Sequence, residues 1–195
     1  MLNPFVTTGY QGSNYFCNRE TETKNIIRSL KNKQSLTLTS IRGIGKTGLI
    51  KHVLSNLPKS YAGIYFDILP TENLSEFLNI LTSAIFNKIP EKSKFGKRIL
   101  EYIKSLRPVI TYDPLSGHPQ VKIETKSGET NMCLESLLLY LETYPSRVIL
   151  AIDEFQQITK YPEKNVDSFL RSIIQSLNNV HFIFSGSQQH LMTEL

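Results

Sequence analysis

The sequence predicts an α/β domain in which helices flank a largely parallel sheet. β-branched, apolar segments alternate along the chain with segments whose apolar residues have helical spacing. One segment, Val148 to Ile152, is apolar throughout, as expected of a parallel strand covered on both faces. The 195 residues, 40% hydrophobic and 20% charged, fit one globular domain over residues 1–195.

The first strand is expected at residues 35–41, where polar and apolar side chains alternate. A helix is expected to begin at Lys46, because apolar residues then recur at helical spacing until Pro58. The intervening turn reads "SIRGIGKT". The stretch is therefore expected to be a strand, a glycine-containing turn and a helix.

This turn carries the second half of the phosphate-loop pattern G-x-x-x-x-G-K-[ST], with Ser40 in place of the first glycine. Gly43 and Gly45 would let the backbone curl around an anion at the helix N-terminus. Lys46, expected to be an exposed loop lysine, would reach the β- and γ-phosphates, and the Thr47 hydroxyl would bind Mg²⁺. The alternative is a tight strand-to-helix turn with a solvated lysine.

The other elements follow from the same periodicities. Further strands are expected at residues 61–68, 147–155 and 180–186. Helices are expected from Leu74 to at least Ile85 with Asn73 as N-cap, at 94–105, 132–144 and 166–177, and from residue 187 onward. Residues 108–124 predict a β-hairpin around Asp113–Gly117, with an irregular loop as the alternative.

An acidic pair, Asp153 and Glu154, ends the apolar segment of residues 147–155. Carboxylates at the end of a buried strand are costly unless a positive charge meets them. With a phosphate loop present, Asp153 would hold Mg²⁺ through water and Glu154 would polarise the attacking water. The alternative is a pair of solvated loop carboxylates. The loop and the acidic pair together favour a nucleotide site.

Several motifs in order resemble a known family. They are "NPF" (3–5), "YF-x-x-RE-x-E" (15–22), "GKT" (45–47) as Walker A, "VILAIDEF" as Walker B with "IDEFQ" (152–156), and "FIFSGS" as a sensor strand. The chain thus resembles prokaryotic P-loop ATPases of the AAA+ and STAND group, and is similar to an archaeal and bacterial ATPase family from about residue 3 to the end.

The resemblance implies an ATPase of P-loop NTPase fold that uses ATP and Mg²⁺. It implies catalytic roles for Lys46, Glu154 and Ser187, with Ser185 as the competing sensor residue, and metal binding by Thr47 and Asp153. Phe16 and Arg19 would lie near the adenine. The full nucleotide-binding set is Phe16, Arg19, Arg42, Gly43, Ile44, Gly45, Lys46, Thr47 and Gly48.

The resemblance also implies a core strand order of 1-4-3-2 with the fifth strand missing. The chain stops at Leu195, whereas relatives continue through a fifth strand, a helical lid and usually a winged-helix domain, so the chain is expected to be the N-terminal nucleotide-binding portion. The strand at 35–41 would then have an open edge that favours self-association. The resemblance identifies no arginine finger: Arg171, on the helix after Walker B, is one candidate, and a solvated helix residue is the favoured interpretation for it.

Two alternatives to an ATPase remain: a nucleotide-gated binding module with negligible turnover, and a DNA-associated protein. The net charge of +5 suits an anionic ligand, and the support for DNA is the basic segment between residues 88 and 107, where a solvated face is the favoured interpretation. Cys17 and Cys133 have no metal-site spacing, the first residues do not show the pattern of a secretory signal, and no apolar run is long enough to predict a membrane span. We therefore expect reduced thiols, a cytoplasmic location, no membrane partner, and a protein partner that the sequence does not identify.

Overall fold

The computed structural model describes residues 9–13, 16, 18–89, 93–106, 108–115, 117–125 and 128–187. The motif at Asn3–Phe5, Tyr15, Cys17 and the helix expected after Ser187 lie outside the described residues. Among the described residues, no helix is long and apolar enough to cross a membrane.

The core is a parallel sheet of four strands, β1 (Leu36–Thr39), β2 (Tyr61–Asp67), β5 (Arg147–Asp153) and β6 (Val180–Gly186). Their order across the sheet is β1-β6-β5-β2, and all three pairings are parallel. Numbered along the chain, these four strands have the predicted order 1-4-3-2. The carboxyl ends of parallel strands all lie at one end of the sheet. The candidate site residues predicted from the sequence follow these carboxyl ends.

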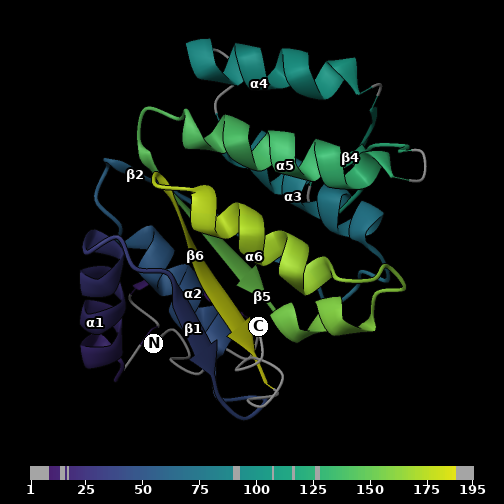
Figure 1. Cartoon of the computed structure of the whole chain (residues 1–195). Helices are drawn as coiled ribbons and strands as arrows, with labels where there is room; N and C mark the ends of the chain where they lie inside the picture. The colour runs from purple at the N-terminus through teal and green to yellow at the C-terminus, as the bar shows by residue number, and fades with distance from the viewer. Residues whose placement is uncertain are drawn as a thin grey trace.

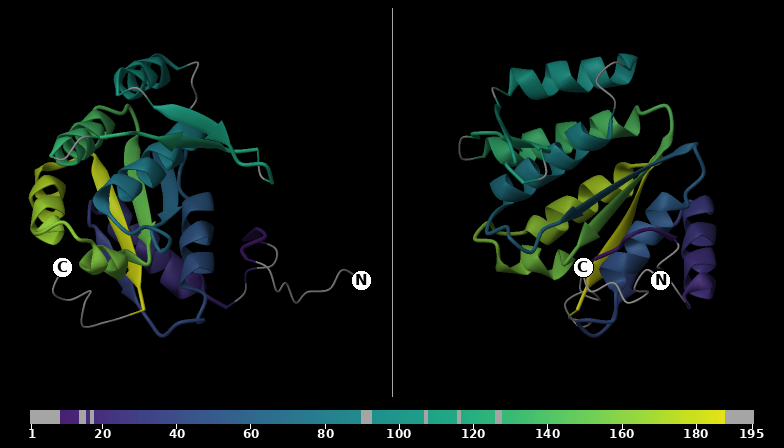
Figure 2. Two further views of the ribbon diagram at one scale, coloured as in Figure 1. Left: turned by 90° about the vertical axis from the view of Figure 1, so that its right-hand side faces the viewer. Right: turned by 180° about the vertical axis from the view of Figure 1, so that it is seen from behind.

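Helices cover both faces of this sheet (Figures 1 and 2). One face carries α1 (Glu20–Lys31) and α2 (Lys46–Ser55). The other carries α3 (Leu74–Lys88), α5 (Glu129–Glu142) and α6 (Val166–Ser176). A further helix, α4 (Lys94–Ser105), packs outside α5 through ring contacts of Phe95 and Tyr102 with Tyr140.

The central strand β5 explains why its sequence is apolar without alternation. Ile149 and Ala151 belong to the core beneath α1 and α2, whereas Val148, Leu150 and Ile152 belong to the core beneath α3, α5 and α6. Successive side chains of a strand point to opposite faces, so a strand buried on both faces needs apolar residues at every position.

The predicted hairpin is present as β3 (Val109–Tyr112) and β4 (Pro119–Lys122), which pair antiparallel. It is anchored to α3 by side-chain acceptors: Ser83 Oγ accepts from the Val121 N–H at 2.8 Å and Asn79 Oδ1 from the Ile123 N–H at 2.7 Å. These bonds satisfy two backbone N–H groups of the hairpin that do not take part in the β3–β4 pairing.

Several element boundaries differ from the prediction, and the larger differences concern four places. The strand expected at 35–41 covers only Leu36–Thr39, and the strand expected at 147–155 ends at Asp153, because Glu154 has a left-handed backbone with φ 54°. The segment Phe155–Lys160 is instead a 3-10 helix, η2. The helix expected at 132–144 spans Glu129–Glu142, and α1 was not predicted.

Candidate functional site

The loop between β1 and α2 has the backbone of an anion cradle. Gly43 and Gly45 have φ values of 88° and 79°, a left-handed conformation that side chains disfavour. Gly45 is the N-cap of α2, and no side chain in the part of the chain that the structure describes caps the first N–H groups of that helix. Those N–H groups and the positive end of the helix dipole can therefore receive an anion.

Lys46 is not the exposed loop lysine that the sequence suggested. Its side chain is only 9% exposed, and its ammonium donates to the carbonyl oxygens of Ser40, at 3.0 Å, and Ile41, at 3.4 Å. The aliphatic part of the Lys46 side chain is buried along the loop because the ammonium reaches across the loop to the residues at its start. Ser40 contributes through its backbone carbonyl, so the missing first glycine does not prevent this arrangement.

Asp153 joins the loop to the sheet. Its Oδ2 accepts from Thr47 Oγ1 at 2.6 Å and from the Tyr65 hydroxyl at 3.0 Å. Its Oδ1 accepts from Ser185 Oγ and from the Glu154 N–H. The carboxylate is 2% exposed, so these four bonds satisfy a group that would otherwise be costly to bury.

Tyr65 donates to Asp153 from the neighbouring strand β2. Burial, and then the negative charge of Asp153, raises the pKa of the Tyr65 hydroxyl well above its ordinary value. The phenol therefore stays protonated and remains a donor. Asp67 lies opposite Asp153 in the β2–β5 register, and burial likewise raises the pKa of its carboxyl.

Glu154 lies directly after β5 and is half-buried. Its Oε2 accepts from the side-chain amide of Gln156, and Ser187 Oγ lies 3.5 Å from the same oxygen. The two candidate sensor serines thus contact different acids, Ser185 the Asp153 carboxylate and Ser187 the Glu154 carboxylate.

The N-terminal segment lies against α2 beside the loop. Phe16 stacks on the His52 ring, with centroids 4.1 Å apart, and a Cβ at Gly48 would lie 3.9 Å from the Phe16 ring. Arg19 donates to the Ile44 carbonyl, so it holds the loop backbone. Of the two predicted adenine-side residues, Arg19 thus contacts the loop, and Phe16 lies along α2 between Gly48 and His52, whereas Arg42 and Ile44 are exposed on the loop itself.

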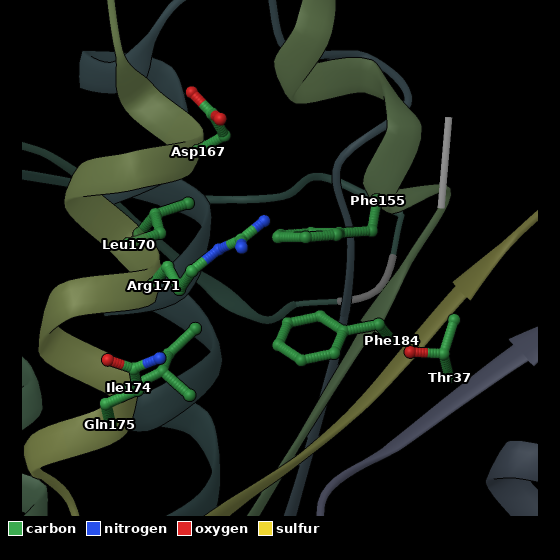
Figure 3. A pocket seen from close by; sticks show the side chains of 8 residues that line it. All are labelled: Thr37, Phe155, Asp167, Leu170, Arg171, Ile174, Gln175 and Phe184. Atoms are coloured by element: carbon green, nitrogen blue, oxygen red, sulfur yellow. The ribbon is translucent and has the colours of Figure 1, made fainter. Parts of the chain in front are cut away.

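A pocket of about 340 Å³ lies elsewhere, between α6 and the strands β1 and β6 (Figure 3). Its lining includes Arg171, whose guanidinium extends toward the Phe155 ring in Figure 3, but no residue of the loop and neither acid of the pair. The pocket therefore does not define the candidate site, and Arg171 lies in a groove of the α6 face.

The structure brings together the loop residues 42–48, Asp153, Glu154, Ser185 and Ser187 at one end of the sheet. Sequence reasoning did not identify Tyr65, Gln156 and His52. For Tyr65 the sequence offers one indication: it lies on a predicted strand of the core sheet, two residues before the acidic residue Asp67. Gln156 follows the acidic pair by two residues, but nothing in the sequence shows where its amide points.

Three features together define the class of P-loop nucleoside triphosphatases. They are a glycine loop that opens a helix, a buried lysine within that loop, and an acidic pair at the end of β5, which lies two strands from β1 in the sheet. The chain belongs to the family of ATPase domains found predominantly in Archaea, whose sequence profile matches residues 16–195. The relationship to prokaryotic P-loop ATPases that the sequence motifs implied is thereby confirmed.

Solved structures share this fold. The Walker-type ATPase PABY2304 of Pyrococcus abyssi matches with a TM-score of 0.60 and 21% identity over 98% of this chain and 51% of its own. The ORC2 protein of Aeropyrum pernix, solved as ADPNP and ADP complexes, matches with a TM-score of 0.56 and 14% identity over 97% and 46%. The ORC1 protein of Aeropyrum pernix, solved with DNA, matches with a TM-score of 0.56 and 17% identity over 92% and 41%.

The chain thus spans about half, or less, of the length of these solved structures. At these identities the likeness concerns the fold. No curated protein matches the chain.

Proposed function

We propose that this chain binds ATP with Mg²⁺, hydrolyses it, and couples its nucleotide state to a partner or to a C-terminal domain. The observation that carries the proposal is the bond between Thr47 Oγ1 and Asp153 Oδ2. It places a hydroxyl and a carboxylate oxygen side by side at the N-terminus of α2, where phosphate would bind.

The loop would bind the phosphates through its N–H groups and Lys46. The Lys46 ammonium already lies within the loop, on the carbonyls of Ser40 and Ile41, and a bound phosphate would offer it stronger, charged acceptors. We assign the adenine side to Phe16, which stacks on His52 of α2, and to Arg19, which donates to the Ile44 carbonyl of the loop.

The residues present fit Mg²⁺. Thr47 and Asp153 supply the hydroxyl and carboxylate oxygens that this ion prefers, and Mg²⁺ usually completes its shell with phosphate oxygens and water. Among the described residues, no group of three or more His, Cys, Asp or Glu side chains could hold a metal, so an all-protein cage is not the expected arrangement. When bound, the ion would neutralise charge on the β- and γ-phosphates.

Hydrolysis would use Glu154 as the acceptor that orients the attacking water. The water oxygen bonds to the γ-phosphorus, the bond to the ADP oxygen breaks, and the proton of the water passes toward Glu154 and then to the released phosphate. Ser187 lies close enough to the Glu154 carboxylate to contribute to this arrangement. Lys46 would stabilise the charge on the transferring group.

The test is the variant Glu154→Gln, with Glu135→Gln on the exposed side of α5 as control. We expect Glu154→Gln to bind ATP as the parent does and to release almost no phosphate, because the amide keeps the shape but cannot accept the proton. The control should match the parent in both assays. Phosphate release by Glu154→Gln at the parental rate would remove Glu154 from the proposal.

Two other functions stay as alternatives. A nucleotide-gated binding module would bind ATP without phosphate release by the parent chain. A DNA-associated protein is supported by the exposed basic side chains Lys97, Arg98 and Lys104 on α4, and it would show DNA affinity that falls steeply with salt.

A further inference from the structure

Gln156 is a buried polar side chain that folding alone does not explain. It is 6% exposed, and among the described residues its Oε1 has no hydrogen-bond partner. A buried acceptor without a donor opposes folding, and an apolar side chain of the same length would avoid that penalty. The benefit of a glutamine here must therefore come from its other end.

That other end holds Glu154. The Gln156 Nε2 donates to Glu154 Oε2. The orientation of the amide follows from chemistry, because an ionised carboxylate only accepts hydrogen bonds, so nitrogen and not oxygen must face it. This orientation is what leaves Oε1 directed away from Glu154 and unpartnered.

The backbone around this pair is fixed on both sides. Glu154 is in the left-handed region with φ 54°, and its carbonyl accepts from the Gln157 N–H at 2.9 Å. The Gln156 carbonyl accepts from Thr159 Oγ1 at 2.8 Å inside η2. A rigid, buried donor thus contacts a carboxylate that is itself only half-buried, and the donor determines which way the carboxylate turns.

We infer that Gln156 is a positioning residue for hydrolysis, which fixes the Glu154 carboxylate through the hydrogen bond from its Nε2 to Glu154 Oε2. The inference rests on the proposed role of Glu154. It assigns Gln156 no contact with the nucleotide.

The test compares Gln156→Met with Gln157→Met in the whole chain. Methionine keeps the length and flexibility of glutamine without its polar atoms. Gln157 is a matched control, since it is the next residue and its amide donates to the Thr71 carbonyl at 2.8 Å, away from the acidic pair. For Gln156→Met we expect kcat to fall about tenfold or more, with KM for ATP unchanged and the melting temperature not lowered. Gln157→Met should keep the parental kcat.

A double-mutant cycle shows whether Gln156 acts through Glu154. Gln156→Met should reduce the rate of the parent but not the residual single-turnover rate of Glu154→Gln. Parental kcat in Gln156→Met, an equal loss in Gln157→Met, or a loss that persists in the Glu154→Gln background would each overturn the inference. A drop in melting temperature with unchanged kcat would show a structural role instead.

The cycle also separates this inference from the function on which it rests. If Glu154→Gln hydrolyses ATP at the parental rate, or the parent does not hydrolyse it, the proposed function fails and the inference fails with it. If Glu154→Gln is impaired and Gln156→Met is not, only the inference fails.

Discussion

Thr47 Oγ1 donates a 2.6 Å hydrogen bond to Asp153 Oδ2, across 106 positions of the chain. Because Asp153 is also held by Tyr65 and Ser185, one carboxylate ties the start of α2 to the strands β2, β5 and β6. The protein's own hydrogen bonds thereby fix the distance between the loop and the acidic pair. Such preorganisation is what a reaction catalysed by positioning and electrostatics needs.

Replacing Asp153 with Asn should weaken Mg²⁺-dependent ATP binding and lower stability. The new amide presents N–H donors where the carboxylate accepted, so at least one buried donor loses its partner, at about 1–3 kcal/mol. Titration calorimetry with and without Mg²⁺ would measure the first effect, and urea unfolding the second.

Asp67→Asn is the matched control for this prediction, because Asp67 lies opposite Asp153 in the strand register. It should keep the parental gain in ATP affinity on adding Mg²⁺. An equal loss of that gain in both variants would contradict the assignment of the metal to Asp153.

Lys46→Ala should abolish detectable ATP binding. Its effect on stability should be modest but real, because the carbonyls of Ser40 and Ile41 lose their donor, at about 1 kcal/mol. Lys51→Ala is the control: Lys51 lies on the same helix and packs over the Tyr65 ring, 4.7 Å from its centroid. Calorimetry that found parental affinity in Lys46→Ala would contradict the phosphate-loop assignment.

The parts of the fold that sequence predicted are those with strong local signals. The apolar runs of β5 and β6 and the Asn73 cap of α3, whose Oδ1 accepts from the Glu76 N–H, are local signals of this kind. Helix α1 was not predicted from the sequence because its buried positions, Thr23, Ile26 and Leu30, lie among charged and polar residues. Its stability comes from packing in the core beneath α2, and a linear pattern shows that packing poorly.

The candidate site likewise contains residues that local sequence signals predict and residues that depend on the three-dimensional fold. The sequence predicted Thr47, Asp153 and Glu154 as site residues because each lies at the end of a predicted element. It could not place Ser185 and Ser187 on different acids, since Ser187 follows the end of β6 and the direction of its side chain depends on how the chain bends there. It also could not predict that Lys46 is buried or that Gln156 holds Glu154, because both depend on how the loop and η2 turn in space.

Self-association through β1 stays a prediction. Among the described strands, β1 pairs only with β6, so its other edge presents unpaired backbone groups. Sedimentation velocity should show concentration-dependent dimers, and Thr37→Lys should reduce them, because Thr37 is exposed on this strand and a lysine there disfavours edge pairing. A monomer at every concentration, with amides 36–39 protected from hydrogen exchange, would contradict the prediction.

His181 should make the stability of the chain depend on pH. It is 5% exposed on β6, and burial, and then the positive charge of Arg147, lowers the pKa of its imidazole below the ordinary 6.5, against an opposing contribution from Glu142. Between the lowered value and 6.5 the unfolded chain binds more protons than the folded chain, so the free energy of unfolding decreases as the pH falls. Above that range the contribution is constant.

Urea midpoints measured from about pH 7.5 down to about pH 5.5 should therefore decline less steeply for His181→Leu than for the parent. His118→Leu, at an exposed position of the hairpin turn, should retain the parental slope. Parallel slopes for the parent and His181→Leu over this range would show that protonation of His181 does not control acid stability.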